Sequence, residues 1–79
     1  MDVKEHPAYD SSLRHAAKRA HDNKGDCFSV YWDGEAVYVR ASEAVPPPNS
    51  TLVCIAQHWA ADGQVQLRFK GAWSEWISF

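Results

Sequence analysis

Between residues 11 and 24, apolar residues recur with the period of a helix. They fall at i, i+3, i+4 and i+7 and form one narrow stripe: Leu13, Ala16, Ala17 and Ala20. Asp10, Ser11 and Ser12 offer N-cap oxygens, and Gly25 offers the left-handed residue that commonly ends a helix. The pattern therefore predicts a helix from Ser11 to Lys24 that packs closely through small side chains.

The opposite side of this predicted helix is basic and carries Arg14, His15, Lys18, Arg19 and His21. One interpretation is a solvated surface whose late cations complement the helix dipole, and the other is a surface that contacts phosphate. We favour the solvated surface, because surface charge alone specifies no partner.

The stretch CFSVYWDGEAVYVRA alternates apolar and polar residues on both sides of Asp33-Gly34, a dipeptide typical of a two-residue hairpin turn. With those two residues as the loop, the cross-strand pairs are Trp32–Glu35, Val30–Val37 and Phe28–Val39. The other side of the ribbon then receives the more polar set: Cys27, Ser29, Tyr31, Tyr38 and Arg40. This alternation is typical of a sheet with one buried face.

A second hairpin is predicted from Thr51 to Lys70, and its turn near Gly63 allows two registers. A two-residue loop at Asp62-Gly63 gives the pairs His58–Leu67 and Ala56–Phe69. A three-residue loop with Gly63 in the left-handed conformation gives the pairs Trp59–Val65, Gln57–Leu67 and Ile55–Phe69. We favour the three-residue loop, because it separates apolar from polar side chains better. A slip of one residue would exchange the two faces of a strand.

Three consecutive prolines separate the hairpins and exclude both a helix and a central strand, so residues 44–50 are predicted to be a proline-rich connection. The C-terminal GAWSEWISF fits either a strand or a helix. The chain is predicted to be one domain, residues 1–79, with residues 1–9 flexible. Its fold is α+β: an N-terminal helix packs on one face of a four- or five-stranded antiparallel sheet built from two hairpins. The helix stripe is expected to meet Phe28, Val30, Val37, Val39, Val53, Ile55, Leu67 and Phe69.

Composition is that of an ordinary globular protein, with 46% hydrophobic and 23% charged residues. The net charge of −2 gives no global attraction to nucleic acid or to an anionic membrane. The N-terminus has no apolar export segment, and no stretch approaches the roughly 18–20 apolar residues of a membrane span. We therefore expect a cytoplasmic protein, in which Cys27 and Cys54 are free thiols.

Of all residues in the sequence, Cys54 and His58 most resemble a reactive or metal-binding pair. On a helix their spacing would bring them together as zinc ligands, but on a strand it separates them by about 13 Å, four steps of ~3.3 Å. The neighbouring β-branched and aromatic residues favour the strand. The sequence also lacks a glycine-rich phosphate loop, a zinc-protease helix and a serine elbow. We expect no catalytic residue, no metal and no cofactor, and we do not expect an enzyme.

The favoured registers gather aromatic and cationic side chains on the sheet face away from the core: Tyr31, Tyr38, Arg40, His58, Arg68 and Lys70. Tyr and Arg are enriched at interface hot spots, and they also stack on single-stranded bases, although ordinary exposed sheet residues give the same pattern. We expect a small module that binds a protein partner through a sheet face or edge, as an adaptor or inhibitor does. The alternative is single-stranded nucleic-acid binding through this face and the basic helix, which acidic residues in the turns disfavour. An open edge permits a homodimer as well as a monomer.

Overall fold

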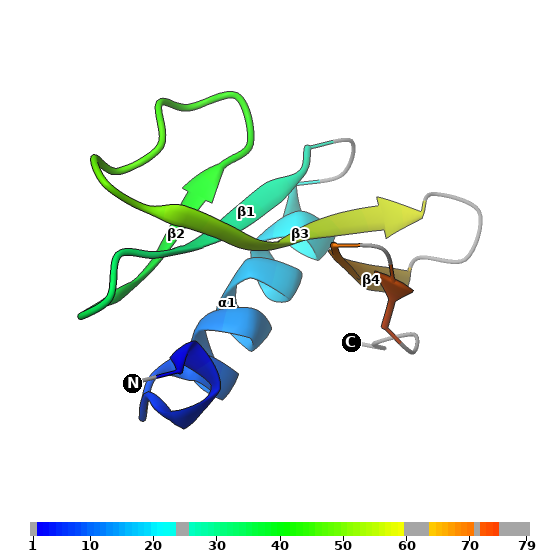
Figure 1. The fold of residues 1–79 in the computed structure, drawn as a ribbon. Coiled ribbons are helices and arrows are strands. Elements are labelled where there is room, and N and C mark those ends of the chain that lie inside the picture. The colour runs from blue at the N-terminus through cyan, green and yellow to red at the C-terminus, as the bar shows by residue number, and fades with distance from the viewer. Residues whose placement is uncertain (1, 24–25, 60–63, 71, 75–79) are drawn as a thin grey trace.

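A computed structural model describes residues 2–23, 26–59, 64–70 and 72–74 of the chain. The helix α1 (Tyr9–Asp22) lies against one face of an antiparallel sheet with the strand order β2-β1-β3-β4-β5 (Figure 1). The strands are β1 (Phe28–Trp32), β2 (Val37–Ala41), β3 (Thr51–Trp59), β4 (Gln64–Phe69) and β5 (Ala72–Trp73), and a 3₁₀ helix η1 (Val3–Glu5) precedes α1. The predicted α+β fold is confirmed.

The helix begins two residues earlier than predicted, and its N-cap residue is Ala8. A turn closed by the Tyr9 N–H on the His6 C=O, at 3.0 Å, leads directly into the helix. The His6 Nδ1 accepts the Ala8 N–H at 3.0 Å and so satisfies a backbone donor at this end. The predicted N-cap oxygens of Asp10, Ser11 and Ser12 therefore fall inside the helix, and that prediction is wrong. The helix ends at Asp22 with Asn23 as its C-cap residue, two residues before the predicted end at Lys24, and Gly25 lies outside the described residues.

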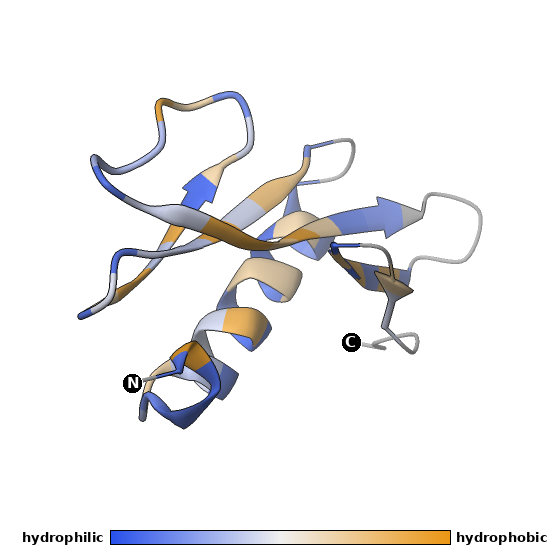
Figure 2. Ribbon diagram, viewed as in Figure 1, coloured by the Kyte–Doolittle hydropathy of each residue, from blue (hydrophilic) through white to orange (hydrophobic). Residues whose placement is uncertain are grey.

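The alanine stripe forms the contact between helix and sheet. Ala16, Ala17 and Ala20 are fully buried, and Leu13 packs beside them at the edge of the core. On the sheet side the core consists of Phe28, Val30, Cys54, Ala56, Val65 and Leu67. Figure 2 shows the resulting alternation of hydrophobic and hydrophilic residues along α1 and along the strands. Small side chains on both elements let the helix approach the sheet closely.

The first hairpin has the predicted faces but not the predicted register. Its pairs include Trp32–Val37, Val30–Val39 and Phe28–Ala41, a shift of two residues. The reason is the Asp33 carboxylate, whose Oδ1 accepts the N–H groups of Glu35 and Ala36 at 2.8 Å each. Asp33 therefore opens the turn instead of occupying its centre, and Gly34 takes the positive φ of 99° that the turn requires. A shift of two leaves every side chain on its predicted face.

The favoured register of the second hairpin is wrong. The observed pairs are Cys54–Phe69, Ile55–Arg68, Ala56–Leu67, Gln57–Gln66, His58–Val65 and Trp59–Gln64, an odd shift that exchanges the faces of β3. Close packing decides the outcome, because Cys54 and Ala56 are small enough to lie beneath the alanine stripe. Ile55, expected in the core, lies on the other face, whereas Val53 packs against the core beside a register shift between β1 and β3. The predicted turn residues 61–63 lie outside the described residues.

The predicted proline-rich connection, residues 44–50, lies within the stretch 42–50, which contains no helix or strand and carries the chain from β2 across β1 to β3. Figure 1 shows it on the side of the sheet away from α1. Ser29 and Tyr31 point to that side, yet they are only 2% and 8% exposed, and the Ser29 hydroxyl hydrogen-bonds the Ser42 hydroxyl at 2.8 Å. The connection therefore lies beside a part of the outer face that solvent scarcely reaches.

The C-terminal segment begins as a strand, because β5 pairs with β4 through Arg68–Trp73 and Phe69–Ala72. Residues 75–79 lie outside the described part of the chain, so the choice between strand and helix is settled only for the first residues. No described helix has the length and apolar character needed to cross a membrane.

Candidate functional site

The six predicted binding residues do not form one surface. Tyr38 and Arg40 lie on β2, at one edge of the sheet, whereas Arg68 lies on β4, with β1 and β3 between them, and Lys70 follows β4. Tyr31 points to the same outer face but is buried. His58 points to the opposite face, so its predicted membership of the outer face is wrong.

His58 lies beside the C-terminal half of α1. Its ring meets that of His21 edge to face, with centroids 6.1 Å apart, and its Nε2 is buried without a hydrogen-bond partner among the described residues. His58 pairs with Val65, which is fully buried, so it shares the helix-facing side of the sheet. This histidine is part of the core rim and contributes nothing to the outer face.

Tyr38 is held in place by the hairpin turn. Its hydroxyl donates to the Asp33 Oδ2 at 2.9 Å. The N–H groups of Ala36 and Glu35, followed by the Tyr38 hydroxyl, hold the pKa of the Asp33 carboxyl below its usual value. Donating to that carboxylate, and lying beside its negative charge, raises the pKa of the Tyr38 hydroxyl. The hydrogen bond to Asp33 in the turn thus holds the Tyr38 ring in place at the edge of the sheet.

Arg40 rests on this ring. Its guanidinium carbon lies 5.4 Å from the Tyr38 ring centroid, and its Nη1 donates to the Val39 C=O at 3.0 Å. Arg40 is exposed to solvent. The guanidinium is therefore positioned at the outer edge of the sheet while it keeps access to a partner.

A second arginine–aromatic pair lies toward the other edge. The Arg68 guanidinium lies 5.7 Å from the Trp73 ring centroid, and Trp73 is 45% exposed. Beside it is a hollow of about 340 Å³ whose lining includes Leu52, Ile55, Arg68 and Lys70. This surface is separate from that of Tyr38 and Arg40.

Among the described residues, β1 is the only strand that pairs with β2. Residues of an antiparallel strand alternate between those that direct both N–H and C=O to the partner strand and those that direct both away. The Asp33 N–H donates to the Ala36 C=O at 3.4 Å, and the Ser42 N–H donates to the Cys27 C=O at 3.0 Å. The even-numbered residues of β2 and its flanks therefore bond to β1.

The odd-numbered residues of β2 direct their backbone groups outward. Because β2 is the first strand in the sheet order, the N–H and C=O groups of Val37 and Val39 face no strand in the described part of the chain. The Val39 C=O accepts a hydrogen bond from the Arg40 Nη1. Such an edge can accept a further strand through main-chain hydrogen bonds.

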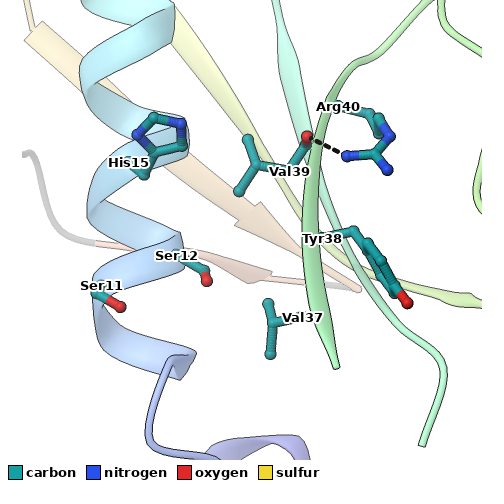
Figure 3. Close-up of a pocket in the computed structure, with 7 residues that line it drawn as sticks. All are labelled: Ser11, Ser12, His15, Val37, Tyr38, Val39 and Arg40. Carbon is teal, nitrogen blue, oxygen red and sulfur yellow. Dashed lines mark hydrogen bonds between the residues drawn. The ribbon is translucent and has the colours of Figure 1, made fainter. Parts of the chain in front are cut away.

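A groove of about 510 Å³ runs between this edge and α1 (Figure 3). Its helix side carries Ser11, Ser12 and His15, and its sheet side is Val37 to Arg40. Figure 3 shows Ser12 pointing toward β2, while Val37 and Val39 point toward α1 and Tyr38 and Arg40 point the other way. The groove thus combines outward-facing backbone groups of β2 with the Ser11 and Ser12 hydroxyls and the His15 imidazole.

No pattern in the sequence predicts this groove. The sequence predicted that Ser11 and Ser12 cap the helix. It placed His15 on a basic, solvated side of the helix and not beside a strand. The groove exists because β2 is an edge strand that lies beside α1, and strand order follows from long-range pairing that no local pattern encodes.

Neither metal binding nor thiol chemistry is favoured by the described residues. They contain no group of three His, Cys, Asp or Glu side chains that could hold a metal ion. Both cysteines are free, and burial raises the pKa of the Cys54 thiol to about 12, which suppresses the reactive thiolate. No protein-family model matches the chain, and no curated protein or solved structure matches it. The function must therefore be argued from the surface itself.

Proposed function

We propose that this protein is a small non-enzymatic binding module that takes up an extended segment of a partner protein along the free edge of β2. The observation that carries the proposal is the outward direction of the Val37 and Val39 backbone groups next to the groove beneath α1. An added strand would complete these hydrogen bonds and extend the sheet. The role is that of an adaptor or inhibitor, with Tyr38 and Arg40 at the interface.

The groove supports strand addition over binding to a flat sheet face. An added strand would lie about 4.8 Å from β2, and alternate side chains would point toward α1. On that side they would meet the hydroxyls of Ser11 and Ser12 and the imidazole of His15. Main-chain bonds would supply affinity, and the groove would supply selectivity.

Single-stranded nucleic acid is the weaker candidate. Stacking on a sheet requires accessible rings close together, but Tyr31 is buried and Trp73 lies toward the opposite edge from Tyr38. The observations on β2 therefore favour a protein segment.

A neutral probe tests strand addition without any contribution from charge. We expect a short peptide of alternating threonine and glutamine, titrated to millimolar concentration, to shift the amide NMR signals of Val37 and Val39 and to slow their hydrogen exchange. Methylation of alternate peptide nitrogens should abolish binding for one set of positions and leave it for the other, because only one set faces β2. Equal loss from both sets, or no binding by any peptide, would contradict strand addition.

Val39→Pro provides the matching change in the protein. It removes an N–H that points away from β1, so the hairpin ladder stays intact while the edge loses a donor. We expect weaker peptide binding by Val39→Pro than by Val39→Ala, which loses the same side-chain packing but keeps the N–H. Thermal unfolding of both variants verifies that they are folded, and equal affinities would argue against an interface at this edge.

A further inference from the structure

We propose that the segment that pairs with β2 is acidic and that Arg40 selects it. This inference rests on the proposed function, because it names the chemistry of the partner for the same edge. Three features support it: the position of the Arg40 guanidinium, the residues that line the groove, and the short distance between side chains that face each other on adjacent strands.

Arg40 occupies an acceptor that an added strand needs. Its Nη1 donates to the Val39 C=O at 3.0 Å, and Val39 is one of the residues that directs its backbone outward. An incoming strand would place its own N–H on this carbonyl, so the guanidinium must release it. In the free protein Arg40 therefore protects the edge, as charged side chains on edge strands commonly do.

A carboxylate on the incoming strand gives the released guanidinium a new partner. Side chains directly opposite one another on adjacent strands lie about 4.5–5.5 Å apart, and a residue opposite Arg40 would share its outer face. Arginine binds carboxylates through two parallel hydrogen bonds. The Tyr38 ring, fixed by Asp33, keeps the guanidinium at this position during the exchange.

The charges around the groove also suit an acidic segment. On the α1 side its lining carries the Ser11 and Ser12 hydroxyls and the His15 imidazole, whereas Tyr38 and Arg40 point to the outer face, and none of these lining residues has a carboxylate. The free N–H groups of Val37 and Val39 add two more donors. A carboxylate opposite Arg40 therefore meets the guanidinium on the outer face, whereas a lysine at that position would meet like charge.

A second copy of the chain fits this edge less well. Symmetric pairing of two β2 strands would bring the Arg40 side chains of both copies to one seam. The cost of placing like charges close together favours a foreign acidic strand over self-pairing. Light scattering on the peptide-free protein tests this point, and a stable dimer that Val39→Pro disrupts would overturn the proposal.

Three short peptides in which threonine alternates with glutamate, glutamine or lysine test the selection. We expect the glutamate peptide to bind about two- to fivefold more tightly than the glutamine peptide, the range typical of one exposed ion pair, and the lysine peptide to bind least. High salt should reduce the advantage of glutamate. Amide shifts in an NMR titration measure all three affinities at the same edge.

Arg40→Gln should remove the preference for glutamate over glutamine. Arg68→Gln, which removes an exposed arginine at a distant place on the outer face, is the matched control and should keep the preference. Equal binding of the glutamate and glutamine peptides to the unmodified protein would overturn acidic selection but leave strand addition standing. Failure of all three peptides to bind would instead contradict the proposed function itself.

Discussion

At the scale of single residues, Asp33 organises the functional edge. One carboxylate accepts two backbone N–H groups and the Tyr38 hydroxyl, and Tyr38 in turn supports Arg40. These bonds to the charged form lower the pKa of Asp33. The same residue therefore sets the hairpin register and the position of the proposed selector.

Asp33→Asn isolates the contribution of this charge. A carboxyl whose pKa is lower in the folded than in the unfolded state stabilises the fold at pH values above its unfolded pKa of about 3.9. That stability is lost as the pH falls through the lowered folded pKa. We expect Asp33→Asn to unfold at a lower temperature than the unmodified protein at neutral pH, with the difference vanishing in strong acid.

Thermal unfolding followed by circular dichroism across this pH range measures the effect. Glu43→Gln, which neutralises an exposed carboxylate outside the turn, is the control and should follow the unmodified protein more closely. A constant difference between Asp33→Asn and the unmodified protein from neutral to strongly acidic pH would show that shape, and not charge, makes Asp33 important.

At the scale of secondary-structure elements, a register error of two residues keeps each side chain on its predicted face of the sheet, whereas an error of one residue exchanges the two faces. The first hairpin is shifted by two residues, so Tyr38 and Arg40 still point to the predicted face. The second is shifted by one, so His58 and Ile55 exchange sides. Hydrophobicity favoured Ile55 in the core, whereas the close approach of the alanine stripe favours Cys54 and Ala56. Packing between elements, which a single strand pattern does not contain, overrode the local preference.

Ala17→Leu tests this account of close packing. Ala17 is fully buried between α1 and the sheet, and leucine is also a good helix former, so the change acts on packing more than on helix propensity. We expect the free energy of unfolding to fall by about 1–3 kcal/mol. Urea unfolding measures the loss, and Arg14→Leu at an exposed position of the same helix should change stability far less. A stable Ala17→Leu variant would mean that the helix does not approach the sheet closely.

At the scale of the whole molecule, strand order creates the candidate site. The alternating patterns predicted the helix, both hairpins and the class of fold, but not that β1 and β3 would pair and leave β2 at the edge. That arrangement depends on the connection through residues 42–50 crossing to the far side of β1. Because the Val37 and Val39 backbone groups face away from the other described strands only in this order, the proposed interface could not be predicted from the sequence.

The same strand order places Cys54 at the centre of the molecule and makes it a probe of global unfolding. It is 1% exposed on β3, between β1 and β4 and beneath α1, and burial raises the pKa of its thiol to about 12. Thiolate is the reactive form, so modification requires opening of the sheet and return of the thiol to its ordinary pKa near 8.5.

In a Cys27→Ser variant, which leaves Cys54 as the one remaining thiol, we expect labelling by a thiol reagent to report the same free energy of opening as urea unfolding. The complementary Cys54→Ser variant leaves the half-buried Cys27, which should label much faster under native conditions. Labelling of Cys54 as fast as that of Cys27 would mean that β3 separates from its neighbours without global unfolding. In that case the strand order, and with it the free edge of β2, would not be a stable property of the fold.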